Sequence, residues 1–223
     1  MTAPIAELVR KRVNAAPAGA FVRTLDLVEA LGSRAAVEAA LTRLTRTDGP
    51  LVAAGRGLYF RGKSTRFGMT APDPLSVGYE VARTHGYTSG VGPAGYSAAR
   101  ALGLTTQVPG RHELAVPGRA PADLPGVHFT SRSSAGRSGL RPMEVAVVEI
   151  LREWPRYAEG TWAALCGRVG DLATRGAVDP VAIHRAVRLE HHLNARVHAD
   201  QLLADIKAGG AGHVVVPTRR RLA

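Results

Sequence analysis

Apolar side chains recur every three to four residues at the start of the chain, which is the spacing of an amphipathic helix. The first such group has charged residues on its opposite side and consists of Ile5, Leu8, Val9 and Val13. Pro17 and Gly19 end the helix that this group predicts, and residues 21–23 indicate a very short strand. The chain is therefore expected to begin with a helix that buries one face, followed by a strand.

Two further helices are predicted with almost no chain between them. Thr24 is a good N-cap for a helix over residues 25–31, and Ser33 is a good N-cap for a helix over residues 34–46. Gly32 lies between them as a C-terminal stop. The apolar face of the earlier helix is predicted to consist of Leu25, Val28 and Leu31, and that of the later one of Val37, Ala40, Leu41 and Leu44.

A short hairpin follows these helices. Residues 51–54 and 58–61 are apolar runs on either side of Gly55-Arg56-Gly57, which supplies glycines where positive φ is needed. The order of helix, strand, helix, tight turn, helix and hairpin is typical of a winged helix-turn-helix. A small α+β domain that used these elements only for packing would have the same order.

The polar positions of the third helix favour the DNA-binding interpretation. The face opposite its apolar stripe carries Arg34, Ala35, Ala39, Thr42, Arg43 and Arg46. Small residues let a helix enter a major groove, threonine and arginine donate hydrogen bonds to bases and phosphates, and a helix N-terminus can hold a phosphate. The candidate DNA-binding residues are Ser33, Arg34, Thr42, Arg43, Arg46, Arg56, Arg61 and Lys63.

Charge strengthens that interpretation. The 223 residues carry a formal net charge of +11, and residues 1–67 hold 11 Lys and Arg against 5 Asp and Glu. Positive charge of this density attracts phosphate backbones. No run of aromatic residues suited to stacking single-stranded bases accompanies it, so duplex DNA is the expected partner.

Cellular location follows from what the chain lacks. A single cysteine, Cys166, excludes an internal disulfide framework and fits a reducing compartment. Alanines and a leucine surround it, so we expect a buried side chain and not a catalytic thiol. Neither a secretory segment nor an apolar run of membrane-spanning length is present. A cytoplasmic protein with no membrane contact is expected.

The remaining chain predicts a larger and mainly helical domain. Residues 68–74 are expected to form a linker, residues 75–213 a second domain, and residues 214–223 a basic tail. Helices are predicted over 75–83, 94–102, 143–154, 161–173 and 180–207, the last broken near Asn194, with short strands over 113–116 and 127–131. The predicted fold class is α+β: a winged helix-turn-helix over residues 1–67, then a mixed, mainly helical domain with a small sheet.

Two stretches match part of a cofactor-binding or metal-binding pattern but lack its other requirements. Residues 90–95 match the dinucleotide-binding string, but no convincing buried strand precedes them, so a glycine-rich helix entry is expected. His184, His191 and His198 are spaced seven apart and would lie about 10 Å from one another along a helix, too far for shared metal ligation. We expect these histidines to face solvent, and we expect neither a cofactor nor a metal.

One further stretch, with Asp205 and Lys207, is similar to the end of a nuclease motif. It lies at a predicted helix end and lacks the preceding strand of such a motif. The sequence therefore predicts no catalytic centre and a protein that is not an enzyme, although a DNA-targeted nuclease stays an alternative.

Three segments together resemble a known family. The runs Gly32-Ser-Arg-Ala-Ala-Val37, Ala40-Leu-Thr-Arg-Leu44 and Gly55-Arg-Gly-Leu-Tyr59 are similar to the winged-helix domain of AbiEi-type antitoxins of type IV toxin–antitoxin systems. The run Ala101-Leu-Gly-Leu-Thr-Thr-Gln-Val-Pro109, and a basic patch around Arg132 and Arg141, fit the second domain of that family. The resemblance covers roughly residues 1–150.

The resemblance implies an antitoxin that represses its own operon through operator DNA and counters a nucleotidyltransferase toxin. By family position, Thr42 and Arg43 fall on the recognition helix and Arg56 and Tyr59 on the wing, where Tyr59 is expected to pack and not to contact bases. An ordinary winged-helix regulator, whose second domain senses a ligand or dimerises, is the nearest alternative.

Overall fold

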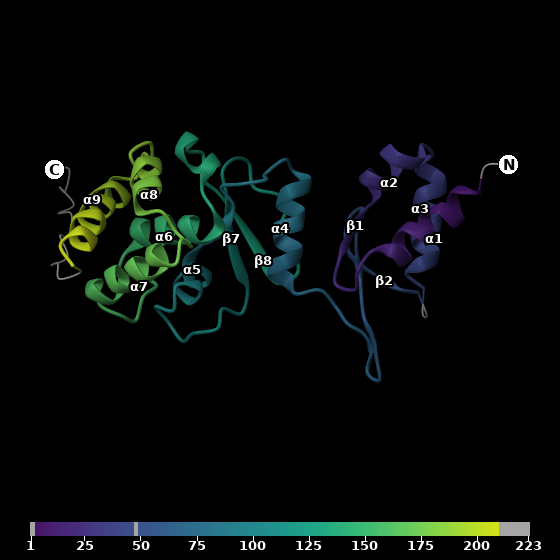
Figure 1. Ribbon diagram of the computed structural model, residues 1–223, viewed down its shortest axis with the longest axis horizontal. Helices are drawn as coiled ribbons and strands as arrows, with labels where there is room; N and C mark the ends of the chain where they lie inside the picture. Colours follow the sequence, from purple (N-terminus) through teal and green to yellow (C-terminus); the bar gives the residue numbers. More distant parts are fainter. Residues whose placement is uncertain (1–2, 47–48, 210–223) are drawn as a thin grey trace, which may run out of the picture. The chain divides into compact units, whose positions relative to one another are not determined.

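The computed structural model describes residues 3–46 and 49–209 of this chain. Its architecture is α+β, as predicted, and the chain divides into two compact units, Met1–Val81 (unit 1) and Ala82–Ala223 (unit 2) (Figure 1). The helix α4 (Pro74–Thr84) spans the division. The basic tail and the end of the second predicted domain, from residue 210 onward, lie outside the described residues.

Unit 1 combines helices with short antiparallel strands. In chain order its elements are α1 (Ile5–Ala15), β1 (Phe21–Arg23), α2 (Thr24–Leu31), α3 (Arg34–Leu44), β2 (Leu51–Gly55), β3 (Leu58–Arg61), β4 (Ser64–Thr65) and β5 (Gly68–Met69). The first three strands form an antiparallel sheet in the order β1-β3-β2, and β4 pairs only with β5. The expected linker over 68–74 therefore begins with a strand.

The core of unit 1 forms where the three helices meet. Val9 and Val13 of α1 and Val37 and Leu41 of α3 are each fully buried, as the helical spacing predicted. In α2, Val28 and Leu31 pack against the core as predicted, but the third predicted residue, Leu25, is 55% exposed, whereas Leu27 is buried.

The N-cap of α2 also differs from the predicted one. Thr24 is the first residue of α2 and not its N-cap, because β1 passes directly into the helix with Arg23 at the cap position. Ser33 does cap α3, since its hydroxyl accepts a hydrogen bond from the Ala36 N–H at 3.4 Å. Gly32, with φ of 92°, supplies the left-handed turn between the helices.

Unit 2 is mainly helical around a small mixed sheet. Its elements are β6 (Gly92–Pro93), α5 (Gly95–Ala101), β7 (His112–Val116), β8 (Val127–Ser131), the 3-10 helix η1 (Ala135–Gly139), α6 (Pro142–Glu153), α7 (Trp162–Thr174), α8 (Pro180–Val187) and α9 (Leu193–Lys207). Strand β7 pairs antiparallel with β6 and parallel with β8.

Most predicted elements of unit 2 are present, together with two that were not predicted. Strand β6 and helix η1 were not predicted, because each is too short to carry a periodic pattern. The predicted break of the 180–207 helix near Asn194 is confirmed, since residues 188–192 separate α8 from α9. The glycine-rich stretch 90–95 leads into α5 as a helix entry, as expected.

The core of unit 2 contains an ionic network as well as apolar side chains. Arg137 of η1 is fully buried, and its Nη1 lies 2.6 Å from Glu149 Oε1 of α6. Arg132, just after β8, donates to both oxygens of the same carboxylate at 3.0 and 2.9 Å. Glu190, between α8 and α9, pairs with Arg137 and with Arg152 of α6. This cluster, the Glu149 network, joins four segments of the unit.

The environment of Glu149 sets its ionisation. Burial alone would raise its pKa, but hydrogen bonds from Arg132 and the charges of Arg137 and Arg132 outweigh burial, and the pKa is lowered from its ordinary 4.5. A carboxyl with a lower pKa in the folded state stabilises the fold above its unfolded pKa. That stabilisation is lost as the pH falls through the folded value.

We expect Glu149→Gln to lower the free energy of unfolding by about 3–5 kcal/mol at neutral pH, because it leaves buried guanidinium groups without their counter-ion. The difference from wild type should shrink as the pH is lowered through the folded-state pKa of this carboxyl, which lies below its ordinary 4.5. Urea titrations followed by circular dichroism measure both values. Glu153→Gln is the matched control on the same helix, since its exposed pair with Arg156 contributes no more than about 1 kcal/mol. A Glu149 variant as stable as this control would contradict the assignment.

Candidate nucleic-acid interface

The outer face of α3 is the centre of the candidate interface. Packing of Val37, Ala40 and Leu41 against the core of unit 1 leaves the opposite side of the helix to solvent. The residues that the sequence predicted in and next to α3 are all exposed, and so is Glu38: Ser33, Arg34, Thr42, Arg43 and Arg46. The face is therefore free to approach a ligand without unpacking the helix.

Two of these side chains already have partners within α3. The Arg34 guanidinium lies 3.3 Å from the Glu38 carboxylate, and both side chains are more than half exposed. The Thr42 hydroxyl donates to the Glu38 carbonyl at 2.9 Å, so its oxygen keeps free lone pairs. An exposed ion pair of this kind is weak, and Arg34 can exchange Glu38 for a phosphate at little cost.

Glu38 is the residue that sequence reasoning missed on this face. Its helical position places it beside Arg34 and Thr42, so the spacing alone could have found it. A carboxylate there repels phosphates and can accept a hydrogen bond from a cytosine amino group. It reduces the positive charge of the face but not its capacity for hydrogen bonds.

Arg43 lies at the side of α3 nearest α1. Together with Arg10 and Glu7 of α1 it lines an open depression of about 330 Å³, so basic side chains of both helices border the same hollow. Arg46 lies just after α3 and is exposed.

Arg56 is presented at the end of the β2–β3 hairpin. The pairing of Gly55 with Leu58 leaves Arg56 and Gly57 as a two-residue turn, in which Gly57 has φ of 67°. Arg56 is exposed there, whereas Tyr59, on the next strand, packs against the core as expected.

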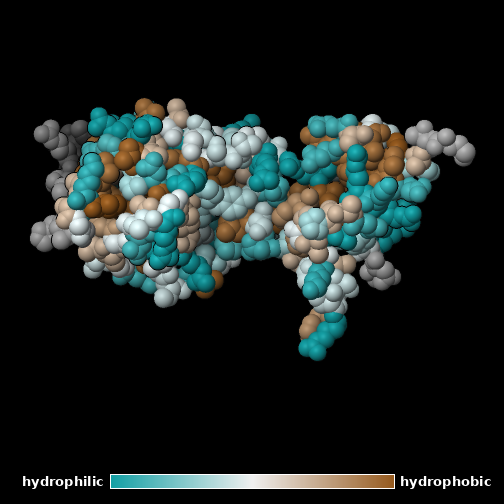
Figure 2. All heavy atoms as spheres, viewed as in Figure 1, coloured by the Kyte–Doolittle hydropathy of each residue, from teal (hydrophilic) through white to brown (hydrophobic). Residues whose placement is uncertain are grey.

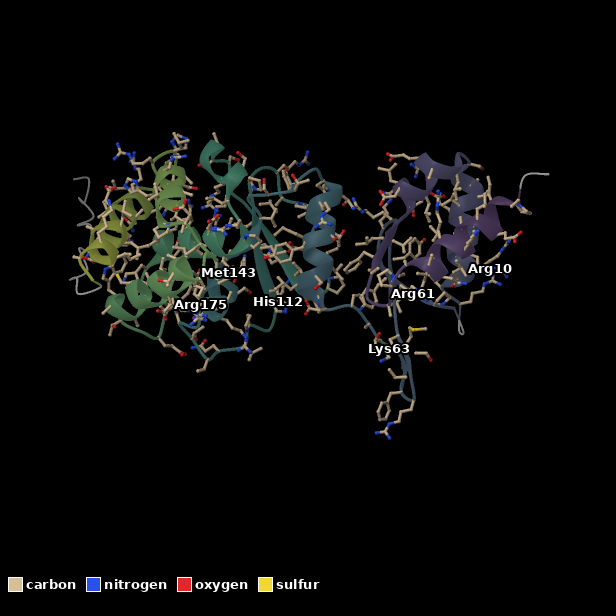
Figure 3. The ribbon with its side chains drawn as sticks, in the orientation of Figure 1. Arg10, Arg61, Lys63, His112, Met143 and Arg175 are labelled. Carbon is tan, nitrogen blue, oxygen red and sulfur yellow. The ribbon has the colours of Figure 1, made fainter. Side chains whose placement is uncertain are left out.

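Arg61 has a different role from the one predicted. Its guanidinium donates to the carbonyl of Ala16, just after α1, and the side chain is only partly exposed. Its backbone also bonds to Gly19 and Ala20 in the loop before β1. Arg61 therefore fastens this loop to the sheet, while Lys63, two residues on, is exposed (Figure 3).

The basic patch expected around Arg132 and Arg141 is not a free positive surface. Arg132 is bound to Glu149, and Arg141 donates to Glu144 at 2.6 Å. Glu149 lies 17 residues after Arg132, and Glu144 lies 3 residues after Arg141. Both charges are therefore paired, but the Arg141 side chain is still 49% exposed, and the basic patch stays a prediction.

The residues considered for nuclease, thiol or metal chemistry are held in packing and hydrogen-bond contacts. Asp205 accepts a hydrogen bond from Trp162 Nε1 at 2.7 Å, and Cys166 is buried, which raises the pKa of its thiol to about 11. His198 is buried and lies 2.7 Å from the Leu151 carbonyl, so the expectation that it faces solvent was wrong. In the described part of the chain, no group of three His, Cys, Asp or Glu side chains is placed to hold a metal.

Comparison with known proteins adds little to this geometry. No family model matches the chain, and no curated protein does. The chain is similar to the crystal structure of RV2827C protein from Mycobacterium tuberculosis, with 20% identity, a TM-score of 0.46, and coverage of 94% of this chain and 78% of that one. A similarity this distant supports no conclusion about function. Over the described residues, no helix is both long and apolar enough to cross a membrane.

We expect Arg61→Ala to destabilise unit 1 by about 1.5–3 kcal/mol, the usual value of a hydrogen bond from a charged donor. Arg56→Ala, at an exposed turn, should leave stability within about 0.5 kcal/mol of wild type. Urea titrations of the two full-length variants make the comparison. If Arg61→Ala were as stable as Arg56→Ala, the anchoring role of Arg61 would be excluded.

Proposed function

We propose that unit 1 is a winged helix-turn-helix that binds operator DNA, and that the whole protein is an antitoxin of the AbiEi type. In this proposal it represses its own operon and counters a nucleotidyltransferase toxin. It acts by binding and has no catalytic activity of its own. It works in the cytoplasm.

The element order of unit 1 carries the proposal. A helix, a strand, two helices separated by a two-residue turn, and a hairpin occur in succession, and the strands pair in the order β1-β3-β2. This is the arrangement expected of a winged helix, with α3 as the recognition helix and the turn at Arg56 as the wing.

The surface of unit 1 supports DNA as the ligand. Helix α3 has 11 residues, which corresponds to about 16 Å at the helical rise, and small side chains at Ala35 and Ala39 occupy its exposed face. Such a helix fits a major groove about 12 Å wide. Arg43 and Arg46 flank the small residues and supply donors for phosphates and bases.

The antitoxin part of the proposal rests on the sequence resemblance. The segment at residues 101–109 that carries it in unit 2 is ordered by contacts with Glu159, which accepts from the Thr106 N–H at 3.0 Å and from the Gln107 side chain at 3.0 Å. Val108 in the same segment is 72% exposed. An exposed apolar residue on an anchored loop is compatible with a partner contact.

We expect the protein to shift duplex DNA from upstream of its own gene, and the double variant Arg43→Ala, Arg46→Ala to abolish the shift. Loss of two phosphate contacts should also reduce the dependence of log K on log salt by about 2 in any residual binding. Electrophoretic mobility shifts at several salt concentrations measure both effects.

The matched control removes the same charge from unit 2. Arg185 and Arg188 are exposed on and just after α8, so Arg185→Ala, Arg188→Ala lowers net charge equally and should leave the shift unchanged. Equal loss of binding in both double variants would show that net charge, and not α3, governs the interaction.

We expect co-expression with a nucleotidyltransferase encoded beside this gene to restore growth that the toxin alone arrests. The Arg43→Ala, Arg46→Ala variant should still protect, because the proposal assigns repression to unit 1 and antitoxin activity to unit 2. Colony counts on induced plates and a promoter–reporter fusion separate the two functions. DNA binding by the wild type, without any protection, would favour an ordinary winged-helix regulator.

A further inference from the structure

A second hairpin in unit 1 has no role in the packing of the unit. Residues 62–70, which we call the arm, comprise β4, the turn Arg66–Phe67 and β5, and every residue from 63 to 70 is exposed. Its strands pair only with each other, at Ser64 with Met69 and at Thr65 with Gly68. Figure 2 shows the arm standing clear of the neighbouring surface, mostly hydrophilic but with apolar atoms near its end.

The turn of the arm is well defined by its own hydrogen bonds. The Thr65 hydroxyl donates to the Gly68 carbonyl at 2.8 Å and accepts from the Phe67 N–H at 3.2 Å. Gly68 has φ of 104°, a conformation that favours glycine. At the base of the arm, Lys63 and Thr70 exchange two further bonds of 2.8 and 3.0 Å. The turn therefore holds its two outermost side chains in position.

Those side chains are an aromatic ring and a guanidinium. Phe67 is 85% exposed, the largest exposed fraction among the large apolar residues of the described chain. The Arg66 guanidinium carbon lies 4.6 Å from the centre of the Phe67 ring. Covering an exposed phenylalanine with a ligand removes apolar surface from water and therefore favours binding.

Charge indicates what kind of ligand that is. Residues 49–72 contain four basic side chains and no Asp or Glu: Arg56, Arg61, Lys63 and Arg66. An open groove of about 710 Å³ runs beside the base of the arm, lined by residues that include Asn14, Arg61 and Lys63, and none of its described lining residues is acidic. Such a groove attracts a polyanion, whereas a protein partner would have no need of an acid-free surface.

We propose that the arm is a second DNA-contacting element, which places Phe67 as an apolar wedge in the minor groove. Arg66 then lies in the same groove, where the negative potential of the backbones is concentrated, and Lys63 lies on a phosphate. Wedge insertion unstacks a base step and bends the duplex toward the major groove. This inference rests on the proposed DNA binding by unit 1 and adds a bend to it.

The test compares Phe67→Ser with wild type on a duplex from upstream of the gene. Circular-permutation gel mobility reports the bend, and titration reports the affinity. We expect Phe67→Ser to remove most of the bend and to weaken binding roughly tenfold, the effect of losing one aromatic contact with a base. Lys63→Ala should instead lower the salt dependence by about one phosphate contact and leave the bend in place.

Leu193→Ser is the matched control, since it removes an exposed apolar side chain from unit 2. Both serine variants should melt at the wild-type temperature, because neither side chain is part of a core. Unchanged affinity and bending in Phe67→Ser, with binding still dependent on Arg43 and Arg46, would overturn the inference and leave the proposed function standing. If the wild type binds no upstream DNA, the proposed function fails and the inference fails with it.

Sedimentation velocity tests whether the arm instead forms a contact between two copies of this chain. If Phe67→Ser changed the oligomeric state and left the bend and the affinity unaltered, the arm would be a contact between copies of this chain. That result would also overturn the inference.

Discussion

The packing of α3 against α1 determines how unit 1 can be used. Val37 and Leu41 are fully buried against Val9 and Val13, and this contact fixes the rotation of α3 about its own axis. A helix turned so that Thr42 took the place of Leu41 would bury a hydroxyl and move Leu44 to the exposed position of Arg43. The direction of every polar side chain on the outer face therefore follows from a few apolar contacts on the inner one, and the proposed recognition surface is only as rigid as that core.

Unit 2 obtains its rigidity in a different way. The Glu149 network sets three guanidinium groups against two carboxylates in a mostly buried position. The Coulombic attraction must offset the cost of removing all five groups from water, so the geometry of the cluster is strongly constrained. Arg132, which looked like part of a basic surface in the sequence, is thus used internally. The number of arginines in the sequence therefore overstates the positive charge on the surface of unit 2, because several of them pair with buried carboxylates.

The sequence predicted the elements whose signals are local. Ser33, the apolar stripe of α3 and the β7 and β8 strands depend on neighbours within a few residues, and each was correctly placed. Errors arose where a partner is distant along the chain: Arg61 bonds to Ala16, and His198 to Leu151. Periodicity carries no information about such contacts. The turn Thr65-Arg66-Phe67-Gly68 did offer a local signal in its glycine, but two-residue strands have no alternation to confirm it.

The direction of the arm depends on the lack of a Cβ atom at Gly62. Gly62 is buried where β3 ends and the arm begins, and a Cβ at this position would lie 2.4 Å from the Met69 side chain and 2.8 Å from the Thr70 carbonyl. The two strands of the arm can close on each other only because no side chain separates them there. A methyl group at position 62 would push the two strands of the arm apart at their base and change the direction of the turn. The direction of Arg66 and Phe67 is therefore set at residue 62, at the base of the arm and not at the turn that carries them.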